Sequence, residues 1–244
     1  MNVYSVAHEM TSPQWGAAFA AGHPAARLVT DDRLRAGPLA MFGSPARWPL
    51  LEEARAQGQD WFYGDHAYFR RGEYFRCTRG RLQLDVRAAA KDAMPRRWEQ
   101  LRMQVGRRRH SGSHVLLCLQ SDVHFRLRRI PSWPSEIAAE IARHTDRPVT
   151  VRTKATGHPL RIDLWRAHVV VTHSSMCAVH AVLAGVPCIV LDPEAVGAAF
   201  GSTDLADIET PRWPLNRDPL LWALAEHQWT LDEYRRGVAW RNMQ

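Results

Sequence analysis

The sequence predicts an α/β fold in two lobes. Short apolar runs alternate with segments of helical character in the first half of the chain, and the same alternation restarts near residue 114. The length of 244 residues, of which 45% are hydrophobic and 23% charged, is enough for two compact cores of about 110–120 residues each. This composition also excludes a disordered chain, a collagen and a coiled coil.

Two helices and four strands are expected in the first half. A Ser followed by Pro, a pairing typical of the first turn of a helix, occurs at residues 12–13 and again at residues 44–45. We therefore expect helices over Ser12–Ala21 and from Trp48 to about residue 58. Residues 67–81 are interpreted as a loop with at most one short strand. The expected strands are Asn2–His8, Arg27–Thr30, Leu39–Gly43 and Asp60–Tyr63.

The arginine-rich stretch Arg96–His110, which has few apolar residues and leads into a polar run, is the expected linker between the lobes. Leu and Trp at helical spacing over Asp218–Asn242 predict one or two closing helices that return to brace the first lobe. The expected division is residues 1–110, 111–217 and 218–244. Between linker and tail, strands are expected at His114–Gln120, Pro148–Arg152, Val169–Thr172 and Cys188–Leu191, and helices at Ser135–His144, Leu160–Ala167 and Ser174–Gly185.

The charge of the chain favours anionic partners. Thirty-two Lys and Arg against 25 Asp and Glu give a net charge of +7, which attracts nucleotides, sugar phosphates or nucleic acid. Only two of the basic residues, Lys91 and Lys154, are lysines. The guanidinium excess suits phosphate binding, and a GC-rich genome explains it equally well.

Several classes of protein are excluded by missing patterns. The four cysteines are widely spaced without a CxxC pair, and the histidines show no metal-ligand spacing, so we expect neither a metal nor a redox motif. The motifs of serine hydrolases, P-loop kinases and dinucleotide dehydrogenases are missing too. The sequence shows no signal peptide and no membrane-spanning run, which predicts a cytoplasmic protein without a membrane partner.

A candidate phosphate site follows the strand over Val169–Thr172. This strand leads into His173, Ser174 and Ser175, whose hydroxyls and backbone N–H groups suit an oxygen-rich ligand, although a plain helix cap is the alternative. Arg152 and Lys154 lie two residues apart at the end of the preceding strand and therefore share a face. If these two strands are neighbours, all five side chains converge on one crevice that can hold a diphosphate.

The string RTK…HPL…VVVTHSS…AVLAGVPCIVL, over residues 152–191, resembles the donor-binding half of GT-B glycosyltransferases, especially the bacterial sialyltransferase, capsule and bacteriophage types. Residues 61–69, 74–79 and 228–237 resemble segments of phage and prophage proteins of this class. The resemblance implies two Rossmann-like lobes with a C-terminal closing helix. It also implies that His173, Ser174 and Ser175 hold the diphosphate of a nucleotide sugar, with Arg152 and Lys154 as cationic neighbours and without a metal.

The resemblance further implies a nucleotide-sugar co-substrate, with a UDP-sugar as the first choice, and no other cofactor. Such a transfer needs a base that accepts the proton of the acceptor hydroxyl. Asp65 and His66, beyond the strand over residues 60–63, are the candidate catalytic residues, with Asp65 as the first choice. The alternatives are that both have local structural roles, or that His8 and Glu9 supply the base.

The acceptor is the open question. Arginines interleaved with aromatic residues are typical of surfaces that follow a phosphate backbone. With the phage-like resemblance, this pattern suggests sugar transfer to a hydroxymethylated base of DNA in the cytoplasm of a bacterial host. A saccharide acceptor and a DNA-binding module without turnover are the alternatives, and both a monomer and a homodimer remain open. The candidate DNA-binding residues are Arg70, Arg71, Arg76, Arg107, Arg108 and Arg109.

Overall fold

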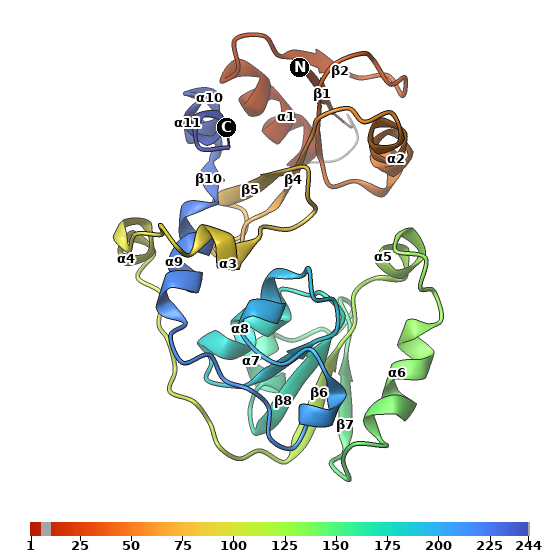
Figure 1. Ribbon diagram of the computed structural model, residues 1–244, viewed down its shortest axis with the longest axis vertical. Coiled ribbons are helices and arrows are strands. Elements are labelled where there is room, and N and C mark those ends of the chain that lie inside the picture. The colour runs from red at the N-terminus through yellow and green to blue at the C-terminus, as the bar shows by residue number, and fades with distance from the viewer. Residues whose placement is uncertain (6–10, 244) are drawn as a thin grey trace. The chain divides into compact units, whose positions relative to one another are not determined.

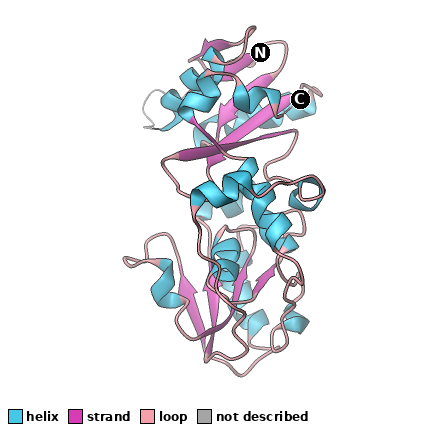
Figure 2. Cartoon of the chain, turned by 90° about the vertical axis from the view of Figure 1, so that its left-hand side faces the viewer, coloured by secondary structure: helices cyan, strands magenta, loops and turns pink. Residues whose placement is uncertain are grey.

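The structure is a computed structural model that describes residues 1–5 and 11–243 (Figure 1). The chain forms two compact units. Unit 1 comprises Met1–Leu84 and Trp222–Gln244, and unit 2 comprises Asp85–Leu221. Each unit contains its own β-sheet covered by helices, so the mixed α/β fold expected from the sequence is confirmed (Figure 2).

The chain passes from unit 1 to unit 2 after Leu84, earlier than the expected boundary after residue 110. The arginine-rich stretch is part of unit 2 because it forms helix α4 (Arg96–Leu101) and then an extended segment bound to the unit. Along that segment, the backbone N–H of Gly106 donates to the Leu183 oxygen at 2.7 Å. Arg217 Nη2 in turn donates to the Gly106 oxygen at 2.7 Å.

Unit 1 is built on a six-stranded sheet with the strand order β10-β5-β4-β3-β1-β2. Strands β1 to β4 are parallel, whereas β5 is antiparallel to both of its neighbours. The strands are β1 (Asn2–Tyr4), β2 (Arg27–Val29), β3 (Leu39–Phe42), β4 (Trp61–His66), β5 (Tyr74–Arg79) and β10 (Trp229–Thr230). The helices are α1 (Thr11–Ala21), a 3₁₀ turn (Pro45–Arg47), α2 (Trp48–Ala56), α10 (Leu231–Arg235) and α11 (Val238–Arg241).

The core of unit 1 joins the two ends of the chain. Trp15 of α1 is fully buried and contacts the ring of Tyr234 from α10, with ring centroids 5.8 Å apart. Helix α10 begins with a capping box in which the Thr230 hydroxyl and the Glu233 carboxylate each bind the other residue's backbone N–H. The C-terminal segment is thus part of the core of unit 1, where α10 lies beside α1 (Figure 1).

Strand β4 runs further than the sequence predicts. It continues through Gly64, Asp65 and His66 because these residues pair with β5, the one short strand of the segment interpreted mainly as a loop. Asp65 and His66 therefore lie within a strand, with Arg76 as the antiparallel partner of Asp65. The alternative base pair His8 and Glu9 lies outside the described residues.

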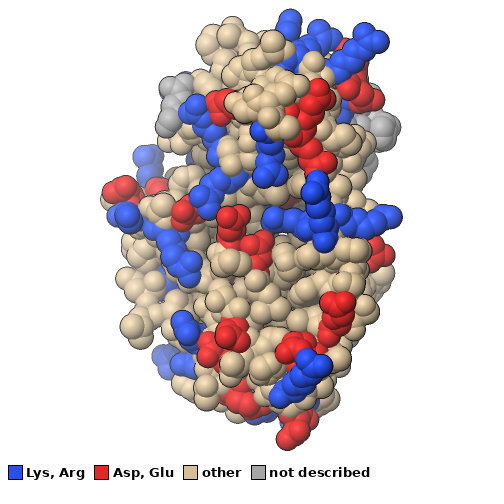
Figure 3. Space-filling view, turned by 45° about the vertical axis from the view of Figure 1, so that its right-hand side comes forward, with Lys and Arg blue, Asp and Glu red and all other residues tan. Residues whose placement is uncertain are grey.

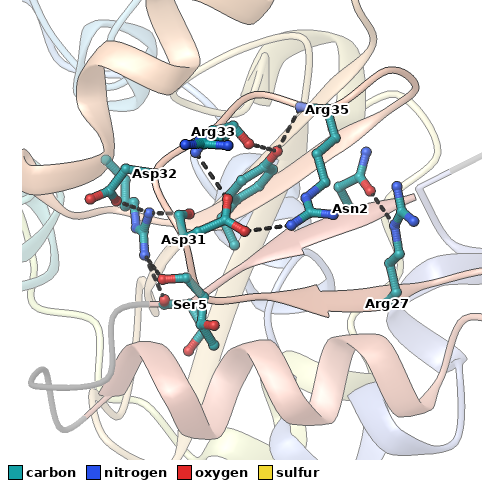
Figure 4. Close-up of polar contacts among 10 residues, drawn as sticks. Asn2, Ser5, Arg27, Asp31, Asp32, Arg33 and Arg35 are labelled. Atoms are coloured by element: carbon teal, nitrogen blue, oxygen red, sulfur yellow. Dashed lines mark hydrogen bonds and ion pairs between the residues drawn. The ribbon is translucent and has the colours of Figure 1, made fainter.

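The carboxyl ends of β1 and β2 are tied together by a buried arginine. Arg47 donates to the backbone oxygens of Ser5 at 3.0 Å and Thr30 at 2.9 Å, and it also forms an ion pair with Asp32. Beside it, the Tyr4 hydroxyl donates to the Arg33 oxygen at 2.9 Å (Figure 4). This network supplies hydrogen-bond donors to backbone carbonyls just beyond the two strands.

Unit 2 is built on a four-stranded parallel sheet with the order β7-β6-β8-β9. Its central strands are buried, as expected for a parallel sheet covered on both faces. The strands are β6 (His114–Cys118), β7 (Val149–Arg152), β8 (Ala167–Thr172) and β9 (Cys188–Val190). The other elements are α3 (Val86–Ala89), α5 (Asp122–Leu127), α6 (Trp133–Ile141), α7 (Leu160–Asp163), α8 (Cys177–Leu183), two 3₁₀ turns (Val196–Ala199, Leu205–Asp207) and α9 (Asp218–Glu226), which spans the division between the units.

No helix within residues 1–5 and 11–243 is both long enough and apolar enough to cross a membrane.

Candidate functional site

Polar side chains gather at the carboxyl edge of the unit 2 sheet, where parallel α/β sheets place their ligands. Strand β8 leads into His173, Ser174 and Ser175, and β6 leads into Gln120. Helix α5, which follows β6, contributes His124. We call these five residues the edge cluster. The sequence predicts three of them, and the fold adds Gln120 and His124.

The Ser174 hydroxyl is the centre of the edge cluster. It lies 3.2 Å from His124 Nε2, 3.3 Å from His173 Nδ1 and 2.7 Å from the carboxamide of Gln120. Ser174 itself is buried. The residues on the loops after β6 and β8 are thus held in one hydrogen-bonded group.

The carboxamide of Gln120 identifies a position where several donors meet. With its oxygen turned toward the serines, it accepts from the Ser174 hydroxyl at 2.7 Å and from the backbone N–H groups of Ser174 at 3.0 Å and Ser175 at 3.1 Å. We assign the oxygen to this position because an amide nitrogen cannot accept from two N–H donors. Three donors therefore converge on one oxygen atom.

The imidazoles of the edge cluster are held neutral. Burial lowers the pKa of His124 to about 4, and the electrostatic effects of the nearby Arg128, His173 and Lys154 act in the same direction, against Asp192. Burial also lowers the pKa of His173. Arg128 Nη2 lies 3.1 Å from Asp192 Oδ2, so the carboxylate that opposes these two shifts is paired with a guanidinium.

The pKa of His124 gives a prediction for stability. In the unfolded chain the imidazole is protonated below about pH 6.5, whereas in the folded chain it stays neutral down to about pH 4. Between these values the unfolded state binds more protons, so stability falls as the pH falls. His124→Gln should therefore lose less stability than wild type between pH 7 and pH 4, by about 1–2 kcal/mol of unfolding free energy. This is less than the whole pKa shift would give, because water screens the partly exposed ring.

Urea unfolding at several pH values measures this effect. The matched control is His110→Gln, because His110 is exposed and outside the cluster. An equal flattening of the pH dependence in both variants would contradict the assignment to His124.

Arg152 and Lys154 do not join the edge cluster in the expected way. Strand β6 lies between β7 and β8, so the strands that carry Arg152 and His173 are not neighbours. Arg152 instead forms an ion pair with Asp163 and donates to the His158 backbone oxygen at 2.9 Å. The expectation that these strands are neighbours, on which the five-residue crevice depended, is therefore wrong. Lys154 is linked to the edge cluster only because its positive charge helps to lower the pKa of His124.

Aromatic rings surround one side of the edge cluster. The rings of Phe125 and Trp133 stack with centroids 5.2 Å apart. Each also meets the His173 ring edge to face, at 6.3 Å and 5.5 Å respectively. This packing fixes the orientation of His173.

Asp65 and His66 belong to unit 1, whereas the edge cluster belongs to unit 2. Asp65 Oδ2 lies 2.5 Å from Arg76 Nη2, and Asp65 Oδ1 accepts from the backbone N–H of His66 at 2.7 Å. The His66 ring meets Phe42 edge to face with centroids 5.3 Å apart. Both residues thus have clear structural contacts, and their catalytic roles remain predictions.

The candidate DNA-binding arginines are divided between the two units, with Arg70, Arg71 and Arg76 in unit 1 and the other three in unit 2. Arg76 is buried against Asp65, which corrects its assignment to a phosphate-contacting face. Arg108 and Arg109 donate to the backbone oxygens of Pro211 at 3.1 Å and Leu164 at 2.8 Å. Arg70, Arg71, Arg107 and Arg108 are exposed, and Arg109 is partly buried. On the face drawn in Figure 3, acidic and basic side chains are interspersed.

Among the residues that the structure describes, no group of three or more His, Cys, Asp or Glu side chains is arranged to hold a metal ion. The sequence-based expectation of transfer without a metal is a statement about mechanism and remains a prediction.

Comparison with known proteins adds information on the fold. No family model matches the sequence, and no curated protein does. KpsC of Thermosulfurimonas dismutans, described as a beta Kdo 2,7 transferase, matches with a TM-score of 0.55 and 10% identity over 99% of this chain and 100% of that chain. A second structure of KpsC, described as a beta Kdo 2,4 transferase, has a TM-score of 0.47 and 11% identity over 93% of this chain and 91% of that chain.

The match to the beta Kdo 2,7 transferase includes both units, and it shows that the chain has an α/β, GT-B-like fold. At 10% identity, the likeness is one of fold. The narrower resemblance to phage and prophage proteins remains a prediction.

Proposed function

We propose that the chain is a glycosyltransferase that takes a sugar from a nucleotide donor. The observation that carries this proposal is the convergence of three donors on one oxygen position beside Ser174 and Ser175. A phosphoryl oxygen is a stronger acceptor than a carboxamide oxygen, because hydrogen bonds to charged oxygens are roughly twice as strong as neutral ones. The phosphate of a donor can therefore replace the Gln120 oxygen at this position.

The surroundings of that position suit a nucleotide leaving group. His124 and His173 are neutral and hold the Ser174 hydroxyl in place, while Arg128 and Lys154 add positive charge that favours an anion. Trp133, which is partly exposed and stacks on the buried Phe125, provides an aromatic ring of the kind that can stack on a nucleobase. With these groups, departure of the nucleotide phosphate is stabilised by fixed hydrogen bonds. A UDP-sugar is our first choice of donor.

Deprotonation of the acceptor is assigned to Asp65 or His66 of unit 1. One carboxylate oxygen of Asp65 is paired with Arg76, and the other accepts from the backbone N–H of His66. Asp65 would therefore have to act as a base while its carboxylate already accepts two hydrogen bonds. The His66 imidazole is the second candidate. Both assignments follow the resemblance to GT-B enzymes, and the activity of the Asp65→Asn variant distinguishes them.

A saccharide is the acceptor we favour. Of the six arginines expected to contact DNA, Arg76 is buried and both Arg108 and Arg109 bind backbone oxygens within unit 2. The structural neighbour KpsC is described as a Kdo transferase, which is a sugar transferase. A hydroxymethylated DNA base is the second candidate, favoured by the exposed Arg70 and Arg71 and by the net charge of +7.

Calorimetry with UDP, GDP, CMP and UDP-sugars tests the donor site. We expect one nucleotide to bind, and His173→Ala to weaken its binding by about tenfold or more, because the variant loses a ring contact and a hydrogen-bond partner of Ser174. His110→Ala is the matched control, since His110 is exposed and remote in sequence. Equal binding by wild type and His173→Ala would contradict the donor site.

The acceptor is tested by adding hydroxymethylated DNA at increasing salt. Binding to a phosphate backbone weakens steeply as salt rises, whereas binding of a neutral glycan changes little. Sugar transfer to DNA would favour the second candidate. Salt-sensitive DNA binding without any nucleotide binding would indicate a DNA-binding module.

A further inference from the structure

The hydrogen bonds around the edge cluster have a fixed direction, which starts from a backbone carbonyl. The Cys118 backbone oxygen can only accept, and it receives the Thr172 hydroxyl at 2.7 Å. Because a hydroxyl has one proton, Thr172 Oγ1 can only accept from the Gln120 carboxamide atom that lies 3.5 Å away. That carboxamide atom is therefore the nitrogen, and the oxygen of Gln120 is on the side of the serines.

The other side of the Gln120 carboxamide gives the same orientation. The backbone N–H groups of Ser174 and Ser175 can only donate, and they lie 3.0 Å and 3.1 Å from the carboxamide atom that faces them. An oxygen at that position accepts from both, and it also accepts from the Ser174 hydroxyl at 2.7 Å. The proton of the Ser174 hydroxyl thus points to Gln120, and Ser174 Oγ can only accept from its other neighbours.

Two of those neighbours are ring nitrogens of neutral imidazoles. His124 Nε2 lies 3.2 Å from Ser174 Oγ, and His173 Nδ1 lies 3.3 Å from it. Because the Ser174 proton points to Gln120, each of these nitrogens donates and carries the proton of its ring. A neutral imidazole has one N–H, so Nε2 of His173 has a lone pair and no proton. Burial lowers the pKa of both rings, which keeps them neutral at pH 7.

The Nε2 atom of His173 is an acceptor that the chain does not use. Among the residues that the structure describes, it forms no hydrogen bond, and His173 is only partly buried. The rings of Phe125 and Trp133 pack against the imidazole and hold its orientation. A ring nitrogen without a proton accepts from hydroxyl groups, whereas a phosphoryl oxygen offers it only further lone pairs.

We propose that Gln120 is a positioning residue that fixes, through Ser174, the proton of His173 on Nδ1, and that His173 Nε2 accepts from a hydroxyl group of the donor. The ligand of this inference rests on the proposed function, and the contact differs from the expected one. The resemblance to GT-B enzymes implies that His173 holds the diphosphate, whereas the hydrogen-bond directions assign it a hydroxyl.

The ribose and the transferred sugar are the two sources of such a hydroxyl. Both are bonded directly to the phosphates of a nucleotide sugar, so their hydroxyls lie close to a ring that also contacts Ser174. A phosphoryl oxygen that replaces the Gln120 oxygen accepts the same Ser174 proton. His173 therefore keeps its proton on Nδ1 when the donor is bound.

Nitrogen NMR of the full chain tests the proton positions without any ligand. Long-range proton–nitrogen spectra distinguish the two tautomers of a neutral histidine, and the His173→Gln variant assigns the signals of His173. At about pH 8, where histidines of ordinary or lowered pKa are neutral, we expect the His173 proton on Nδ1. The exposed His110 reports the unconstrained mixture in the same spectrum. A His173 ring protonated on Nε2, or mixed as in His110, would overturn the proposal.

Variants of Gln120 test its positioning role. Gln120→Met leaves the Ser174 hydroxyl without its acceptor, so the hydroxyl proton should turn to a ring nitrogen and His173 should shift toward protonation on Nε2. Gln120→Glu is the matched control, because it keeps an oxygen acceptor and should retain the wild-type tautomer. If Gln120→Met does not fold, Ser174→Ala should leave His173 with mixed tautomers. An unchanged His173 tautomer in the folded variant, Gln120→Met or Ser174→Ala, would contradict control through Ser174.

Calorimetry with deoxy nucleotides tests the hydroxyl contact. The probes are UDP, 2′-deoxy-UDP, 3′-deoxy-UDP and a UDP-sugar, or the corresponding GDP or CMP set if that nucleotide binds. Loss of the contacted hydroxyl should weaken binding to wild type about five- to tenfold, and His173→Ala should bind the two forms equally. Discrimination against a deoxy form assigns the ribose. A preference for the UDP-sugar over UDP that disappears in His173→Ala assigns the transferred sugar. Equal weakening of all probes by His173→Ala would overturn the contact.

The two measurements separate this inference from the proposed function. If no nucleotide binds, the proposed function fails together with the hydroxyl contact, and the spectra still decide the proton positions. If a nucleotide binds while His173 is protonated on Nε2, the donor site stands and this inference fails.

Discussion

Asp65→Asn should destabilise unit 1 by about 2–3 kcal/mol, because it leaves a buried guanidinium without its carboxylate. The Arg76 side chain is 7% exposed and that of Asp65 is 32% exposed. Arg76 also donates to the Leu82 oxygen at 2.9 Å and lies over the ring of Tyr68. Removing one partner of such a pair costs more than the pair contributes, since the remaining charge stays out of water.

Urea unfolding of the transition that belongs to unit 1 measures this loss. The matched control is Asp60→Asn, which breaks the more exposed pair with Arg79 just before β4 and should cost less than about 1 kcal/mol. Asp65→Asn with Arg76→Met should be less destabilised than the sum of the single changes, because no charge is then left unpaired. Equal losses for Asp65→Asn and Asp60→Asn would contradict the structural role of the pair.

The same variant tests Asp65 as a base. A loss of activity alone is ambiguous, since an unfolded unit 1 is inactive for any reason. The decisive comparison uses a temperature at which Asp65→Asn is still folded and binds the nucleotide as wild type does. A base role then predicts a large fall in kcat with little change in donor affinity. Near-normal kcat would remove Asp65 as the base and leave His66.

The parallel strands could be predicted because burial dominates their sequence. Strand β8 is buried along its whole length and reads as a run of β-branched residues, which is typical of a covered parallel strand. Strand β5 is harder to predict because Arg76 lies in its centre. An arginine in a sequence indicates an exposed position unless the partner that pairs with it in the core is known. That partner, Asp65, is on a different strand.

The edge cluster could be predicted only in part, for a topological reason. The sequence gives the order of strands along the chain but not their order in the sheet, and β6 lies between β7 and β8. This insertion separates Arg152 from His173 and brings Gln120 and His124 to Ser174 instead. The signal for Gln120 was present, since it follows a buried strand whose end lies at the edge where ligands bind.

Trp229→Ala should cost about 3–5 kcal/mol, because it empties the space of a large aromatic side chain in the core of unit 1. Trp229 is 1% exposed, and its ring meets Tyr234 edge to face with centroids 5.9 Å apart. The matched control is Trp165→Ala, since Trp165 is 72% exposed and its loss should change stability by no more than about 0.5 kcal/mol. Similar losses of unfolding free energy in the two variants would contradict the packing of the C-terminal segment.

The effect of Trp229→Ala should extend to the candidate base. Trp229 pairs with Phe75 of β5, and β5 also pairs with β4, where Asp65 lies opposite Arg76. Loosening β10 therefore weakens the strand that fixes Arg76. We expect Trp229→Ala and Asp65→Asn to be non-additive in stability, because both act on β5. If the two losses of unfolding free energy are additive, the C-terminal segment stabilises unit 1 without supporting the ion pair between Asp65 and Arg76. The position of Asp65 would then be fixed by β4 and β5 alone.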